Sequence, residues 1–201
     1  SMVRQKIRQL NIMKIISGKY NKKIVATLNS GNYKPTTTKC REAIFSILSS
    51  GEFFYTQPIV NAKILDLFSG TGILSFESLS RGAKNATLVD NNFEYLRLIK
   101  KFANKIGEKN NINCQLADAS NLSKSTNQYN IVFVDPPYHK NLCTKTITSL
   151  IQNNWLEINS IIVIEMEKMA NISLKNFPNL RLFKEKIYGN TKLLILGYKY
   201  T

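Results

Sequence analysis

Residues 62–72 read Ala62-Lys63-Ile64-Leu65-Asp66-Leu67-Phe68-Ser69-Gly70-Thr71-Gly72. The first part, 62–68, is short and mostly apolar, as expected of a strand that is buried on both faces of a sheet. The glycines that follow permit a tight turn, and a helix is expected from about Gly72. A buried strand, a glycine loop and a helix in this order predict an α/β domain with a ligand site at the carboxyl end of the strand.

The same alternation continues to the end of the chain. A helix is expected from Gly72 to Arg81-Gly82, and two further helices at Phe93–Ile106 and Leu142–Asn153. Strands are expected at Ala86–Asp90, Ile112–Leu116, Ile131–Asp135, Ser160–Met166, Leu180–Tyr188 and Lys192–Lys199. Gly189-Asn190 between the last two strands is typical of a hairpin. The predicted fold is α/β and Rossmann-like: a mostly parallel, doubly wound sheet of about seven strands with a C-terminal antiparallel hairpin.

Residues 1–60 form a different kind of segment. We expect a small hairpin within Met13–Leu28 and a helix that is capped by Thr38 and stopped by Gly51. The chain carries 28 Lys and Arg against 13 Asp and Glu, and residues 1–60 hold ten of the basic and two of the acidic side chains. Such a basic excess suits a polyphosphate partner. The sequence therefore predicts a basic extension (1–60) that packs on the core and grips RNA, and a catalytic domain (61–201).

Several classes of protein are excluded by what the sequence lacks. No stretch approaches the roughly 18 apolar residues of a membrane span. Cys40, Cys114 and Cys143 are too far apart for a metal clip and are odd in number, so we expect reduced thiols. These features predict a cytoplasmic protein that binds neither membrane nor metal.

Acidic residues follow two further strands at positions that suit a nucleoside. Asp90 lies twenty residues after Gly70, where a carboxylate can hold a ribose diol, although alone it could equally cap a helix. Asp118 could accept from an adenine amino group or cap a turn. A third glycine and a Walker lysine are both missing, which argues against a phosphate cradle. Together these features predict S-adenosyl-L-methionine as cofactor, with these candidate residues: Asp66, Phe68, Ser69, Gly70, Thr71, Gly72, Asp90, Asn91, Asp118 and Ala119.

The sharpest motif is Asp135-Pro136-Pro137-Tyr138, directly after an apolar strand. Two prolines fix a rigid turn, and the Pro136 carbonyl is free to accept a hydrogen bond. An exocyclic amine on a base is a poor nucleophile because its lone pair is delocalised into the ring. Acceptance of its hydrogens by Asp135 and the Pro136 carbonyl would favour a pyramidal nitrogen, and Tyr138 could stack on the base. These four residues are the catalytic candidates.

The chain resembles the bacterial RsmD family, which methylates guanine N2 in small-subunit (16S) ribosomal RNA. The resemblance runs from about residue 13 to the end, and its motifs are Ile15-Ile16-Ser17-Gly18, Lys34-Pro35-Thr36-Thr37 with Arg41-Glu42 and Phe45, Phe68-Ser69-Gly70-Thr71-Gly72, Ser80-Arg81-Gly82-Ala83, Phe133-Val134-Asp135-Pro136-Pro137-Tyr138 and Tyr188-Gly189-Asn190-Thr191. The family usually has Gly-Gly at Ser17-Gly18, Arg at Lys34, and a second glycine near Lys22.

The resemblance implies an S-adenosylmethionine-dependent rRNA (guanine-N2)-methyltransferase that acts on small-subunit ribosomal RNA, free or in an assembling particle. We expect this enzyme to be a monomer. Combined with the basic charge, it gives these RNA-binding candidates: Lys22, Lys23, Lys34, Thr37 and Arg41. Two alternatives stay open, an adenine-N6 methyltransferase on DNA or RNA and a non-catalytic RNA-binding or ribosome-assembly factor. Trp155 is expected in the core, and the role of Glu165, near the end of a strand by the pocket, is left open.

Overall fold

The computed structural model describes residues 13–28, 36–52, 58–138 and 141–199. In chain order the elements are β1 (Met13–Lys14), β2 (Ile24–Val25), α1 (Thr38–Ser49), β3 (Lys63–Leu67), α2 (Ile73–Ser80), β4 (Asn85–Asp90), α3 (Phe93–Lys105), η1 (Lys109–Asn111), β5 (Ile112–Leu116), β6 (Tyr129–Val134), α4 (Leu142–Gln152), β7 (Leu156–Glu167), η2 (Leu174–Asn176), β8 (Leu180–Tyr188) and β9 (Thr191–Tyr198). No helix in these ranges is both long and apolar enough to cross a membrane.

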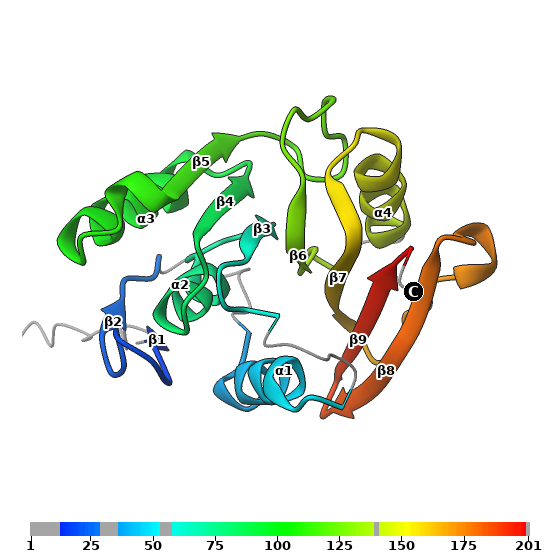
Figure 1. Cartoon of the computed structure of the whole chain (residues 1–201), viewed down its shortest axis with the longest axis horizontal. Helices are drawn as coiled ribbons and strands as arrows, with labels where there is room; N and C mark the ends of the chain where they lie inside the picture. Colours follow the sequence, from blue (N-terminus) through cyan, green and yellow to red (C-terminus); the bar gives the residue numbers. More distant parts are fainter. Residues whose placement is uncertain (1–12, 29–35, 53–57, 139–140, 200–201) are drawn as a thin grey trace, which may run out of the picture.

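Seven strands form one sheet in the order β5-β4-β3-β6-β7-β9-β8 (Figure 1). Strands β5, β4, β3, β6 and β7 are parallel to one another, whereas β9 runs antiparallel to both β7 and β8. The chain winds outward from β3 through β4 to β5, and then returns to β6 on the other side of β3. The switch point, where ligands bind in such sheets, therefore lies between β3 and β6. The predicted seven-stranded, mostly parallel sheet with a C-terminal hairpin is confirmed.

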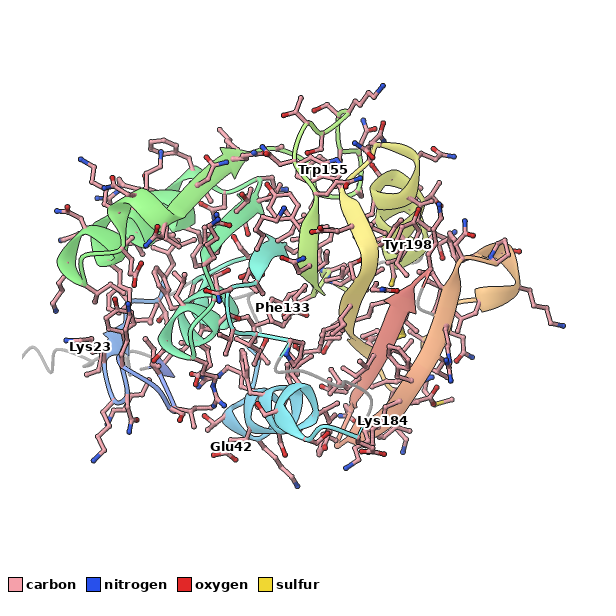
Figure 2. All side chains as sticks on the ribbon, viewed as in Figure 1. Lys23, Glu42, Phe133, Trp155, Lys184 and Tyr198 are labelled. Atoms are coloured by element: carbon pink, nitrogen blue, oxygen red, sulfur yellow. The ribbon has the colours of Figure 1, made fainter. Side chains whose placement is uncertain are left out.

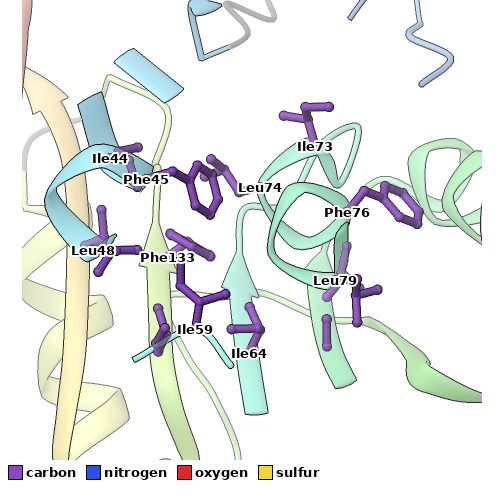
Figure 3. Close-up of a cluster of buried hydrophobic side chains, with 14 of the residues drawn as sticks. Ile44, Phe45, Leu48, Ile59, Ile64, Ile73, Leu74, Phe76, Leu79 and Phe133 are labelled. Carbon is purple, nitrogen blue, oxygen red and sulfur yellow. The ribbon is translucent and has the colours of Figure 1, made fainter. Parts of the chain in front are cut away.

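The two faces of the sheet carry separate hydrophobic clusters. Helices α1, α2 and α3 cover one face, and Figure 3 shows Phe45 of α1 beside Phe133 of β6, with their ring centroids 6.1 Å apart. Helix α4 covers the other face, where Tyr129 stacks on Trp155 at 5.8 Å. Trp155 is buried, so its expected place in the core is confirmed. Each fully buried large apolar side chain contributes about 1.5–3 kcal/mol, so both clusters hold the strand ends rigidly.

Most boundaries agree with the predicted ones to within two residues, and two of the differences have a clear structural cause. The N-cap of α1 is Thr37 rather than Thr38: Thr37 is extended, and its hydroxyl accepts from the Cys40 amide at 3.2 Å. Strand β7 begins at Leu156, four residues before the predicted Ser160. Asn159 there has a φ of 64°, and the pairing with β6 is irregular over the same stretch, so polar residues hide the start of the strand.

The predicted N-terminal hairpin is present as β1 and β2, and it is fastened to α2 by a buried carboxylate. Glu77 is fully buried and accepts from the backbone amides of Ile16 at 2.7 Å and Ser17 at 3.0 Å. Its carboxylate also accepts from Arg81 Nε at 2.9 Å and lies 3.8 Å from Arg41 of α1. Glu77 thus joins the hairpin, α1 and α2, which together form one side of the same core.

The turn of this hairpin lies against the end of α2. Lys19 N donates to the Ser80 carbonyl at 2.9 Å, Tyr20 N donates to Ser80 Oγ at 2.9 Å, and Ser80 Oγ donates to the Ser17 carbonyl. Gly18 adopts a φ of +84°, and a Cβ there would lie 1.9 Å from the Ser80 carbonyl oxygen. Only glycine fits this approach, because any side chain would overlap the backbone of α2.

Candidate active site

A strained loop follows the central strand β3. Phe68, Gly70 and Gly72 all have positive φ values, of 59°, 51° and 75°. Gly72 N donates to the Ser69 carbonyl at 2.8 Å and closes the turn. A bulky non-glycine residue such as Phe68 seldom adopts this conformation, and such outliers gather at functional sites. The loop between β3 and α2 therefore lies at the switch point and holds its backbone in a conformation that residues with side chains seldom adopt.

Gly72 is required for packing rather than for room beside a ligand. A Cβ at this position would lie 2.8 Å from Leu88 Cδ2 and 3.1 Å from Ile99 Cγ1, both in the core. The missing side chain lets α2 start close to β4 and α3. Ser69 gives a clearer sign of a ligand, because its Oγ is buried and has no hydrogen-bond partner among the described residues. Buried hydroxyls are rarely left unpaired, so Ser69 Oγ is available to a polar ligand group.

Asp90, at the end of β4, connects the loop to the neighbouring strand. Its Oδ2 accepts from Gly70 N at 2.8 Å, and its Oδ1 accepts from Asn92 N at 2.8 Å. A carboxylate oxygen has two lone pairs, so each oxygen retains one acceptor site for a ribose hydroxyl. Asn91 is exposed next to it. The two hydrogen bonds from backbone amides fix the orientation of the Asp90 carboxylate. A carboxylate held in this way suits the predicted contact with a ribose.

Asp66, in β3, binds the first turn of α2 and so holds together the two ends of the glycine loop. It is 2% exposed, and Ser75 Oγ donates to its Oδ2 at 2.7 Å. Burial raises the pKa of Asp66 to about 7; the Ser75 hydrogen bonds oppose this shift, and the charge of Asp90 adds to it. The Asp66 side chain thus faces the first turn of α2, and a direct contact between Asp66 and the cofactor stays a prediction. Thr71 is also buried, and its hydroxyl faces Met13 Sδ at 3.5 Å.

Asp118 and Ala119 lie beyond the end of β5. Asp118 is exposed, and its Oδ1 accepts from both Ser120 N (2.8 Å) and Ser120 Oγ (2.7 Å). These hydrogen bonds lower the pKa of Asp118, so it stays a carboxylate and can accept from an amino group. Ala119 is 2% exposed and belongs to the core on the α4 side, so only its backbone could face a cofactor.

The Asp-Pro-Pro-Tyr turn follows β6, directly across the switch point from the glycine loop. Leu67 pairs with Val134, which places Asp135 beside the start of that loop. Asp135 is half-buried and Pro136 is buried, whereas Tyr138 is 47% exposed. An exposed aromatic ring beside a half-buried carboxylate is suited to receive a base from solvent.

Three residues lie near Asp135: Thr36 and Cys40, to which the sequence analysis assigned no role in the site, and Glu165, whose role it left open. Thr36 Oγ1 lies 3.2 Å from Asp135 Oδ2 and 2.9 Å from Glu165 Oε2. Burial raises the pKa of the Cys40 thiol, and the nearby charges of Glu165 and Asp135 raise it further. Cys40 is therefore a neutral thiol. A pattern search along one strand cannot find this group, because its members come from the start of α1, from β7 and from the turn after β6.

The structure places the RNA-binding candidates in different environments. Lys22 and Lys23 are exposed on the hairpin, and Figure 2 shows Lys23 projecting beside it. Thr37 is exposed and caps α1. Arg41 is 2% exposed, donates to the Lys14 carbonyl at 2.9 Å and lies 3.8 Å from Glu77, so its side chain is held against β1 and α2, and a contact with the RNA substrate stays a prediction. Lys34 lies outside the described residues.

The donor and acceptor set fits S-adenosylmethionine. The site offers an oriented carboxylate for ribose hydroxyls (Asp90), an ionised acceptor for an adenine amino group (Asp118), and an unpaired buried hydroxyl (Ser69). The loop that carries Ser69 has no lysine with which to neutralise a polyphosphate. This set matches a nucleoside with a polar tail and no phosphate.

Solved methyltransferases share this fold. A putative methyltransferase from Escherichia coli superposes with a TM-score of 0.77 and 27% sequence identity, over 94% of this chain and 99% of that one. Fold and site together thus define the class, an α/β methyltransferase.

Residues 13–197 match the family model described as conserved hypothetical protein 95, and the chain belongs to this RsmD-like methyltransferase family. An uncharacterized methylase of Rickettsia prowazekii is 37% identical, over 93% of this chain and 98% of the relative. The ribosomal RNA small subunit methyltransferase D of Buchnera aphidicola subsp. Baizongia pistaciae is 34% identical, over 90% of each chain. S-adenosylmethionine is the cofactor that this family implies.

Proposed function

We propose that the protein methylates the exocyclic N2 amine of a guanine in small-subunit ribosomal RNA. The observation that carries the proposal is the place of Asp135-Pro136-Pro137-Tyr138, at the end of β6 and next to the glycine loop of β3. The likeness to relatives named ribosomal RNA small subunit methyltransferase D supports the substrate.

The residues of the turn act mainly by positioning. Asp135 and the Pro136 carbonyl accept the two amine hydrogens, and Tyr138 stacks on the base, a contact worth about 1–3 kcal/mol. The base must be unpaired or flipped out to reach Tyr138. When bound, S-adenosylmethionine supplies the methyl group: the N–C bond forms as the C–S bond breaks, the thioether leaves, and the surplus amine proton passes to solvent. Correct orientation of the amine provides most of the acceleration.

The basic N-terminal part completes the proposal. Residues 1–60 would serve as the RNA grip, through Lys22 and Lys23 of the hairpin, and residues 61–201 as the catalytic domain. Each phosphate contact releases counterions, so binding should weaken steeply with salt. The substrate would be the RNA alone or an assembling particle, bound by a monomeric enzyme.

The test is transfer of a tritiated methyl group to unmodified small-subunit RNA and particles, followed by nucleoside analysis. We expect N2-methylguanosine, and a loss of at least about a hundredfold in Asp135→Ala, because removal of one oriented polar contact in an active site costs about this much. Label in N6-methyladenosine would instead support the adenine alternative. A protein that binds cofactor and RNA but labels neither base would contradict the proposal.

A further inference from the structure

The edge strand β8 presents basic and aromatic side chains on the side of the sheet that α1 covers. β8 is the last strand in the order of the sheet, beside β9 (Figure 1). Leu193 and Ile195 of β9 belong to the cluster beneath α1, and they pair with Lys186 and Lys184 of β8. Paired residues of neighbouring strands point to the same face, and every second residue of a strand does so too. Lys184, Lys186 and Tyr188 therefore all lie on the α1 side of the sheet.

Two cations on this side lie over aromatic rings. Lys39 Nζ, from the first turn of α1, is 5.9 Å from the ring centroid of Tyr188. The Arg181 guanidinium is 5.6 Å from the ring centroid of Phe183. Both rings are half-buried against the cluster beneath α1, whereas both cations are exposed. Contacts of this kind are weak at an exposed surface, so a ligand can displace the cation and take its place on the ring.

These residues form one surface, which we call the basic strip; its members are Lys39, Arg181, Phe183, Lys184, Lys186 and Tyr188. Of its four cations, Lys184 is paired with Glu52 at 2.9 Å, and the other three are exposed. Cations that alternate with aromatic rings suit a single-stranded nucleic acid, because its phosphates bind the charges while its bases stack on the rings. An acidic protein surface would use the charges alone.

The basic strip begins beside the candidate catalytic turn. Thr36, just before α1, has its Oγ1 3.2 Å from Asp135 Oδ2, and the next turn of the chain carries the lysine that lies over Tyr188. Tyr188 pairs with Thr191, which pairs with Glu167 at the carboxyl end of β7. Three strand spacings separate β8 from β6, roughly 14 Å at about 4.8 Å each. A nucleotide that flanks the target, rather than the target itself, would reach this strip.

We propose that the basic strip binds the RNA strand that flanks the target nucleotide, with a base stacked on Tyr188 and phosphates bound by Lys39, Lys186 and Arg181. This inference rests on the proposed function, which supplies RNA as the partner. Stacking of a base on an aromatic ring is stronger than an exposed contact between a cation and a ring, so the base displaces Lys39 and leaves its charge to a phosphate. The RNA-binding surface then extends from the N-terminal hairpin to the opposite edge of the sheet.

The first test removes a charge that has no part in packing. Binding of small-subunit RNA is measured by filter binding over a series of salt concentrations. Lys186→Gln should lower the slope of log Kd against log salt by about 0.7, as for one phosphate contact to a single strand. Lys175→Gln is the matched control and should leave the slope unaltered, because Lys175 is exposed on η2, where the adjacent Leu174 packs against the cluster on the α4 side.

The second test removes the ring. Tyr188→Ala should raise the KM for RNA about tenfold with kcat unchanged, and Tyr188→Phe should restore the KM, because stacking needs the ring and not the hydroxyl. Ile187→Ala shortens the next side chain of β8, which is 48% exposed on the other face, and should leave the KM unaltered. Urea unfolding shows whether Tyr188→Ala is folded; if it is not, Lys186→Gln decides alone.

The outcomes separate this inference from the proposed function. If the wild type makes N2-methylguanosine while Lys186→Gln and folded Tyr188→Ala bind RNA with the Kd and salt slope of the wild type, the basic strip is refuted and the proposed function stands. A defect that is confined to assembled particles, with normal binding of free RNA, would assign the strip to a ribosomal protein and also refute the inference. If the wild type methylates no guanine, the proposed function fails, and the binding data still decide whether the strip contacts RNA.

Discussion

Gly18→Ala tests whether the hairpin is fastened to α2 by the close approach of its turn. The new Cβ would lie 1.9 Å from the Ser80 carbonyl oxygen, far inside contact distance, and neither backbone can shift without opening the turn. The φ of +84° adds about 1–2 kcal/mol of strain for a residue with a side chain. Up to three hydrogen bonds to Ser80 are lost as the turn lifts, at about 0.5–1.5 kcal/mol each. We therefore expect a loss of roughly 3–6 kcal/mol in the free energy of unfolding.

Gly107→Ala is the matched control. Its φ is +79°, but a Cβ there meets nothing within 4 Å, so only the strain remains. Urea unfolding of both variants should show a loss of about 1–2 kcal/mol for Gly107→Ala and a clearly larger one for Gly18→Ala. Hydrogen exchange should show lost protection over 13–28 in Gly18→Ala alone, since the amides of Ile16, Ser17, Lys19 and Tyr20 are bonded to Glu77 and Ser80. Equal losses in both variants, or unchanged protection of 13–28, would refute this account.

Three further predictions concern single side chains. The raised pKa of Asp66 means that the native state holds the Asp66 proton more tightly than the unfolded state, so this contribution to stability is present below pH 4 and is lost as the pH rises to about 7. Asp66→Asn should remove this pH dependence. Thermal melts from pH 4 to 8 in which the melting temperature of the variant falls as steeply as that of the wild type would contradict it. Lys22 has a φ of 66°, so Lys22→Gly should cost little or raise stability by up to about 1 kcal/mol while it lowers RNA affinity and the salt dependence of binding; an unchanged salt slope in filter binding would exclude a phosphate contact. Tyr138→Ala should raise the KM for RNA about tenfold or more, and Tyr138→Phe should restore it; a similar defect in both variants would point to the hydroxyl instead of the stacked ring.

Most of the sheet could be predicted from the sequence, because its signals are local. The apolar run before Gly70 and the run before Asp135 each indicate a strand end from a few neighbouring residues, and the structure places both at the switch point. The start of β7 could not be predicted, because Asn159 breaks the alternation that marks a strand.

The surroundings of other residues could not be predicted, because they depend on contacts between distant segments. Arg41 looks like a surface cation in a basic region, but its partners are Lys14 and Glu77, 27 and 36 residues away. Asp66 precedes a ligand loop, but its side chain turns inward to Ser75. The sequence did give one signal for Glu77, because it is the one charged residue in the sequence of α2, whose other positions are apolar or serine.

The way Glu77 and Ser80 hold the hairpin has a consequence for how this surface can diverge among relatives. Both residues bind main-chain groups of 16–20, which every amino acid other than proline can supply at the amides. Apart from Gly18, and from Lys19 and Tyr20, whose side chains both bind Glu108, these main-chain bonds place little restriction on the neighbouring side chains. If Lys22 and Lys23 contact RNA as proposed, they can be exchanged to suit a different RNA while the hairpin stays in place, so the binding surface can evolve separately from the scaffold that presents it.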